Sequence, residues 1–107
     1  MGDEVFYRSM RFMKKSVRGS KPVKVRLMKI SDEFDGLCIE MIDHFLIKIN
    51  KKLTTGHAID VMLHEFAHVE SWGKGIDPHG IIWGKCYSRL YRDYLNGFIN
   101  SDATLKN

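Results

Sequence analysis

The stretch of this 107-residue sequence that decides the fold is TTGHAIDVMLHEFAHVESW, residues 54–72. Its apolar residues recur at helical spacing, so we predict a helix from Thr54 or Thr55 to about Trp72, before a segment rich in Gly and Pro. One side carries His57, Asp60, Val61, His64, Glu65 and His68, and the other carries Ala58, Ile59, Met62, Leu63, Phe66, Ala67 and Val69, interrupted by Glu70. We therefore expect the apolar side to lie against a sheet while the histidines face a cleft.

Within this helix, His64-Glu65-Phe66-Ala67-His68 has the H-E-x-x-H spacing. Residues four apart on a helix project from one face one turn apart, which is the separation that two imidazoles need to share a metal. Glu65 stands next to a ligand, so it can take a proton from metal-bound water and deliver it to a leaving amine. We predict that His64 and His68 bind Zn2+ and that Glu65 is catalytic.

A tetrahedral zinc site of this kind needs a third protein ligand. His79 is the best candidate, because the segment before it can reverse the chain and bring its imidazole back under the helix. Glu70, Asp77 and His57 are weaker alternatives. Asp60, one turn before His64, is a candidate to orient that imidazole. Candidates for stabilising an oxyanion, which the sequence does not rank, are Tyr87, Tyr91, Arg89 and His57.

The flanking segments predict an α+β fold. Apolar residues at helical spacing indicate an amphipathic helix over the first twenty residues, ending near Gly19. Alternation predicts a strand over 23–27, and two β-prone segments, 37–42 and 45–50, look like an antiparallel hairpin. A second helix is expected from about Gly80 to Asn96, stopped by Asn96-Gly97. We expect a small, mostly antiparallel sheet whose last strand, 45–50, forms the edge beside the cleft.

Composition favours one domain, residues 1–107, in a reducing, cytoplasmic setting. The chain has two cysteines, Cys38 and Cys86, too few for a disulfide framework, and no segment of transmembrane length, so we expect no membrane partner.

Residues 1–30 hold nine Lys or Arg against Asp3 and Glu4, net +7, while the rest is net −3. This basic stripe could track the phosphate backbone of DNA. Its members are Arg8, Arg11, Lys14, Lys15, Arg18, Lys21, Lys24, Arg26 and Lys29.

Two separated motifs resemble the SprT-like family, which includes bacterial SprT proteins and the Spartan proteases that digest proteins crosslinked to DNA. They are DVMLHEFAH, residues 60–68, and DPHGIIW, residues 77–83. The resemblance implies a zincin-like domain in which His79 is the third zinc ligand and Trp83 packs behind it. Ile82 stands where the family often carries a more polar residue, and the cysteines of the C-terminal zinc ribbon of many bacterial members are absent.

Together these features predict a zinc-dependent metalloendopeptidase acting on a protein or peptide substrate, with DNA-bound proteins as candidate substrates. Zn2+ would be held by His64, His68 and His79, and Glu65 would be the general base on zinc-bound water. The alternative is a non-catalytic, zinc-stabilised nucleic-acid-binding module. A fourth protein ligand, such as His57 or Glu70, would indicate that alternative, because structural zinc sites are closed.

Overall fold

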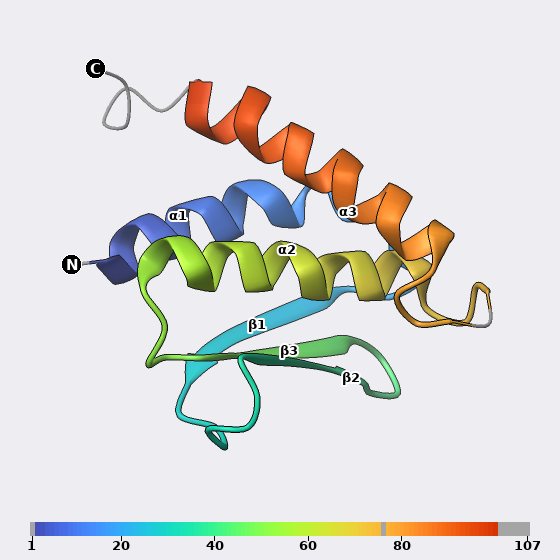
Figure 1. The fold of residues 1–107 in the computed structure, drawn as a ribbon, viewed down its shortest axis with the longest axis horizontal. Coiled ribbons are helices and arrows are strands. Elements are labelled where there is room, and N and C mark those ends of the chain that lie inside the picture. The colour runs from blue at the N-terminus through green and yellow to red at the C-terminus, as the bar shows by residue number, and fades with distance from the viewer. Residues whose placement is uncertain (1, 76, 101–107) are drawn as a thin grey trace.

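The structure, a computed structural model, describes residues 2–75 and 77–100 and has α+β architecture with its helices on one side of a three-stranded sheet (Figure 1). The elements in chain order are α1 (Gly2–Lys14), β1 (Val23–Met28), β2 (Gly36–Glu40), β3 (Phe45–Asn50), α2 (Thr55–Ser71), α3 (Ile81–Asp93) and the π-helix η1 (Tyr94–Ile99). Among the described residues, no helix combines the length and apolar character needed to cross a bilayer.

The sheet is mixed, and its strand order is β1-β3-β2. β3 pairs with β1 in parallel and with β2 in antiparallel register. Two predictions are therefore wrong: the sheet is not mostly antiparallel, and the strand 45–50 is central rather than at the edge. Its inward side chains explain the central position, because Phe45, Ile47 and Ile49 are all fully buried. β2 is the edge strand that faces the cleft.

α2 packs across the inner face of the sheet and forms the centre of the core. Its N-cap is Thr54, whose hydroxyl accepts a hydrogen bond from the His57 amide, so the predicted start of the helix is confirmed. The predicted apolar side is also confirmed, since Met62, Leu63 and Phe66 are fully buried. The opposite side is less open than expected, because β2 lies against it and buries Glu65.

Two predicted helix ends are wrong. α1 ends at Lys14, well before Gly19. At the other end, the helical path runs through Asn96-Gly97 as η1 instead of stopping there. A Cβ atom on Gly97 would lie 2.6 Å from Cζ of Phe12. This glycine therefore permits a close approach of η1 to α1 rather than ending the helix.

Candidate metal centre

Three histidines from two parts of the chain converge at one point. His64 and His68 lie one turn apart on α2, and their Nε2 atoms are 3.2 Å apart. His79, in the segment between α2 and α3, places its Nε2 atom 3.1 Å from that of His68 and 3.3 Å from that of His64. Among the described residues, these three form the one group of His, Cys, Asp and Glu side chains whose spacing could hold a metal ion.

The spacing of the three nitrogens fits zinc. Zinc–nitrogen bonds of about 2.0–2.1 Å in a tetrahedron place neighbouring ligand nitrogens about 3.3–3.4 Å apart. The observed separations of 3.1–3.3 Å are close to this value. Three imidazoles are also a donor set that leaves a fourth position for water or substrate, as catalytic zinc sites do.

The ionisation of the histidines also suits a metal site. Burial lowers the pKa of His68 to about 4, with further contributions from His64 and His79. Burial likewise lowers the pKa of His64, followed by the charge of His79. Both rings are therefore neutral at pH 7, which is the form of imidazole that binds metals.

The turn before α3 brings His79 to the site. Gly73 and Gly75 have φ angles of 72° and 87°, a left-handed conformation that glycine adopts without strain. Asp77 then fixes the next turn: its Oδ1 accepts a hydrogen bond of 2.9 Å from the His79 amide, and its carbonyl accepts one of 3.0 Å from Gly80. Asp77 therefore supports the backbone of His79 and does not join the cluster itself.

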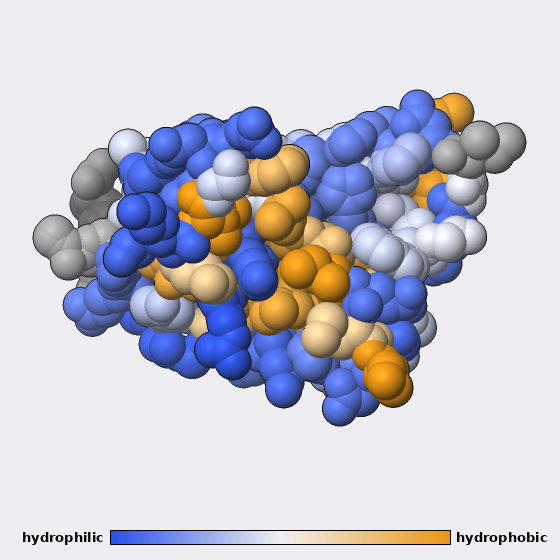
Figure 2. Space-filling model, turned by 90° about the horizontal axis from the view of Figure 1, so that it is seen from below, coloured by the Kyte–Doolittle hydropathy of each residue, from blue (hydrophilic) through white to orange (hydrophobic). Residues whose placement is uncertain are grey.

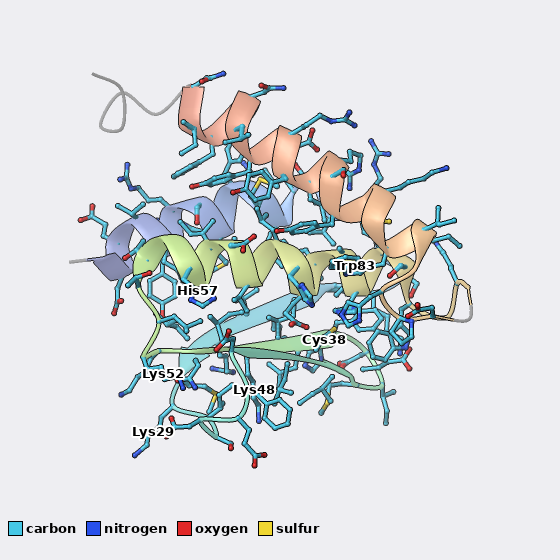
Figure 3. All side chains as sticks on the ribbon, in the orientation of Figure 1. Lys29, Cys38, Lys48, Lys52, His57 and Trp83 are labelled. Atoms are coloured by element: carbon cyan, nitrogen blue, oxygen red, sulfur yellow. The ribbon has the colours of Figure 1, made fainter. Side chains whose placement is uncertain are left out.

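Trp83, on the first turn of α3, packs against all three histidines. Its ring centroid lies 4.8 Å from that of His64, 5.7 Å from that of His68 and 5.0 Å from that of His79. Its indole nitrogen donates a hydrogen bond of 3.3 Å to the His64 carbonyl. The indole lies where α2 and α3 meet (Figure 3), so it ties the two histidine-bearing segments together.

Glu65 lies beside the histidines on the side of α2 that faces β2. It is only 7% exposed, and burial raises the pKa of its carboxyl to about 7. A Cβ atom on Gly36 of β2 would lie 3.4 Å from Glu65 Oε2, so the missing side chain allows strand and carboxylate to come close. Cys38, also on β2, points toward the same region (Figure 3), and burial followed by the charge of Glu65 raises the pKa of its thiol to about 12.

A cleft of about 350 Å³ opens between the helix and the edge strand. Its lining residues are Gly36, Leu37, Cys38, His64, Glu65, His68, Trp72, Pro78 and His79. The β2 residues in this wall were not predicted from the sequence. The sequence does predict the hairpin that contains β2, but it places the segment 45–50, not β2, at the edge beside the cleft.

The other predicted ligands lie outside the cluster. His57 is far along α2 from Trp83 (Figure 3), and its Nε2 atom lies 3.4 Å from Asp35. Glu70 is on the side of α2 opposite to the three histidines. There it forms an ion pair with Arg89 and accepts a hydrogen bond of 2.8 Å from the Arg18 amide. Neither residue lies in the three-histidine cluster, so neither is placed as the fourth ligand that would indicate the structural module.

Arg89 is directed at Glu70 and Asp93, so it lies outside the set that could stabilise an oxyanion. Tyr87 lies nearer, with its ring 6.3 Å from that of His64 and stacked on Trp83 at 5.1 Å. The Tyr87 hydroxyl donates a hydrogen bond to Asp60, a contact that we did not predict although the sequence marked both residues. Burial, followed by this hydrogen bond, raises the pKa of Tyr87.

No family model matches this chain, and no curated protein or solved structure matches it either. The function therefore has to be inferred from the geometry of the metal centre and from the residues around it.

Proposed function

We propose that this protein is a zinc-dependent metalloendopeptidase with a zincin-like domain of the SprT-like type. The observation that carries the proposal is the convergence of three imidazole nitrogens at zinc-ligand spacing next to one buried carboxylate. The order of the groups along the chain, two histidines and Glu65 on one helix and His79 eleven residues later, agrees with the family resemblance.

Each group has a distinct role in peptide hydrolysis. His64, His68 and His79 would hold zinc, which supplies Lewis-acid activation of water and of the scissile carbonyl when it is bound. Glu65 accepts the proton of the attacking water and returns it to the leaving amine. A carboxyl whose pKa is about 7 can do both near neutral pH, because neither of its protonation states is strongly disfavoured.

The edge strand β2 suits a peptide substrate. β3 occupies one side of β2, and no other strand of the described chain pairs with its second side. β2 also forms one wall of the cleft that contains Glu65. An extended peptide can therefore add to this edge through backbone hydrogen bonds, which depend little on its sequence.

The family resemblance extends the proposal to DNA-bound proteins as substrates. The basic N-terminal stripe is not one surface in the structure: Arg11 and Lys14 are exposed on α1, whereas Lys24 and Arg26 are exposed on β1. Lys21 is paired with Glu40 at 3.1 Å. The exposed cations of α1 and those of β1 therefore form two separate surfaces. We assign any contribution to DNA binding to the cations of α1.

The test compares the wild type with Glu65→Gln and His79→Ala for zinc content and for cleavage of a DNA-binding protein, with and without single-stranded DNA. We expect Glu65→Gln to keep its zinc and to lose at least about a hundredfold in turnover, because only the proton carrier is removed. His79→Ala should lose zinc as well. Full activity of Glu65→Gln would end this mechanism, and zinc binding with no cleavage by the wild type would favour the structural module.

A further inference from the structure

The face of the sheet opposite α2 has no helix or strand over it among the described residues (Figure 1). We call it the outer sheet face and define it by Lys24 and Arg26 of β1, Leu46 and Lys48 of β3, and Leu37 and Ile39 of β2. These residues alternate with the inward residues, and none of them belongs to the hydrophobic core cluster. Figure 2, seen from below, shows apolar surface surrounded by hydrophilic side chains on this face.

The strand register sorts the outer sheet face into two halves. One row across the sheet is Lys24, Leu46 and Ile39, and the next is Arg26, Lys48 and Leu37. Cations therefore gather toward β1 and aliphatic side chains toward β2.

The pair Arg26 and Lys48 in the cationic half lacks compensating charge. Arg26 and Lys48 are direct register partners, and like charges opposite each other on neighbouring strands are destabilising. On the three strands, all of which the structure describes, no outward position carries a carboxylate. The salt bridges found among the described residues also leave Arg26 and Lys48 without an acidic partner. An external acidic group would relieve this repulsion.

We propose that the outer sheet face docks an amphipathic protein segment whose apolar side chains cover Leu37, Ile39 and Leu46 and whose carboxylates pair with Arg26 and Lys48. The cationic and aliphatic halves lie on neighbouring strands, which are about 4.8 Å apart. The acidic and apolar stripes of the partner must therefore lie next to each other. An apolar patch bordered by charge is typical of protein interfaces.

Other classes of partner fit this face less well. Single-stranded nucleic acid is held by aromatic side chains on which bases stack, and the outward strand positions carry none. A flat lipid surface would contact the long side chains of Arg26 and Lys48 first. The aliphatic residues beside them are only partly exposed, so they would not reach the apolar interior of the bilayer. A second copy of the same face would bring cations with it and no carboxylates.

The test is an NMR titration of the full chain with a synthetic 16-residue helical peptide that carries a leucine stripe next to a glutamate stripe. We expect amide shifts along β1, β2 and β3. The double variant Arg26→Glu/Lys48→Glu should bind at least tenfold more weakly. The matched control, Arg11→Glu/Lys14→Glu on α1, makes the same charge change elsewhere and should bind within twofold of the wild type. Circular dichroism checks that both variants are folded.

The comparison probes decide between partner classes. A peptide with lysine in place of glutamate should not shift the outer sheet face. The proposal is overturned if that peptide binds equally well, or if no shift occurs up to millimolar peptide. It is also overturned if single-stranded DNA or phosphatidylserine vesicles perturb the same residues at lower concentration than the acidic peptide does, or if the chain dimerises through this face.

Discussion

Glu65 and Glu70 lie five residues apart on α2 and are both nearly buried, but their surroundings give them different properties. Glu70 is 5% exposed, and its charge is balanced by Arg89 and by the Arg18 amide. Glu65 has no hydrogen-bond partner among the described residues, and burial raises its pKa to about 7. A buried carboxyl with a raised pKa next to a cleft is typical of proton-transfer chemistry, whereas a buried ion pair is typical of structure.

Removing the charge of Glu70 should destabilise the fold without affecting the metal centre. We expect Glu70→Gln to lower the free energy of unfolding by about 2–4 kcal/mol, because Arg89 is left partly buried without its partner. Urea denaturation of the metal-free protein measures this, with the exposed Glu33→Gln as the matched control. An effect on zinc content as large as that of His79→Ala would contradict the separation of the two sites.

The pKa of the Cys38 thiol depends first on its burial and then on the charge of Glu65. Its pKa is raised from 9.0 to about 12, so at pH 8 its thiolate fraction should be about a thousandfold below that of an ordinary thiol. In the metal-free protein we expect slow alkylation by iodoacetamide, with a rate that rises with pH up to about 12. Glu65→Gln should speed the reaction because it removes a nearby negative charge. Mass spectrometry of the Cys86→Ser background follows Cys38 alone, and equal rates in both proteins would mean that the two groups do not interact.

At the scale of elements, the contact between β2 and α2 depends on one glycine. A Cβ atom on Gly36 would lie 2.6 Å from Cγ1 of Val61, closer than such atoms pack. Strand and helix approach each other at the point where Glu65 enters the cleft. The position of this strand therefore sets the width of the cleft.

Gly36→Ala should force β2 away from α2. We expect a loss of about 1–3 kcal/mol in the free energy of unfolding, as for overpacked cores, and a loss of turnover with zinc still bound. Gly56→Ala is the matched control, because a Cβ atom there has no neighbour within 4 Å. Calorimetry and the cleavage assay measure the two effects; a Gly36→Ala protein as stable and active as Gly56→Ala would show that the contact is not needed.

The sequence predicts the elements well and their arrangement less well. The start of α2 and the apolar side of the helix follow from capping and from local periodicity, which depend on neighbouring residues. The strand order does not, because β1 joins β3 in parallel from another part of the chain and no local pattern records that pairing. The end of η1 was missed because Gly97 serves a long-range contact with Phe12. At the three-histidine cluster, the closeness of His64 and His68 follows from helical spacing, and the place of Trp83 was implied by the family resemblance, whereas the β2 wall follows from neither.

At the scale of the whole molecule, the proposed zinc site would join α2 to the segment that precedes α3 through His64, His68 and His79. Zinc that binds only the folded chain should therefore stabilise it, by about 2.7 kcal/mol when free zinc is a hundred times Kd. We expect a chelator to lower Tm, and hydrogen exchange to become faster mainly around residues 77–83. A Tm that is unchanged by a chelator, in protein shown to contain zinc, would contradict this coupling.

The described cleft has one wall that is local in sequence and one that is distant. All three histidines and Trp72 lie within residues 64–79, whereas Gly36 and Cys38 come from a strand that lies much earlier in the chain. Selection can therefore act on the two walls independently. If the proposed function holds, substitutions on β2 can change which substrates are accepted while the three histidines stay unchanged. Under the proposed function, a lineage that carries this chain could acquire new substrates while it keeps its three histidines.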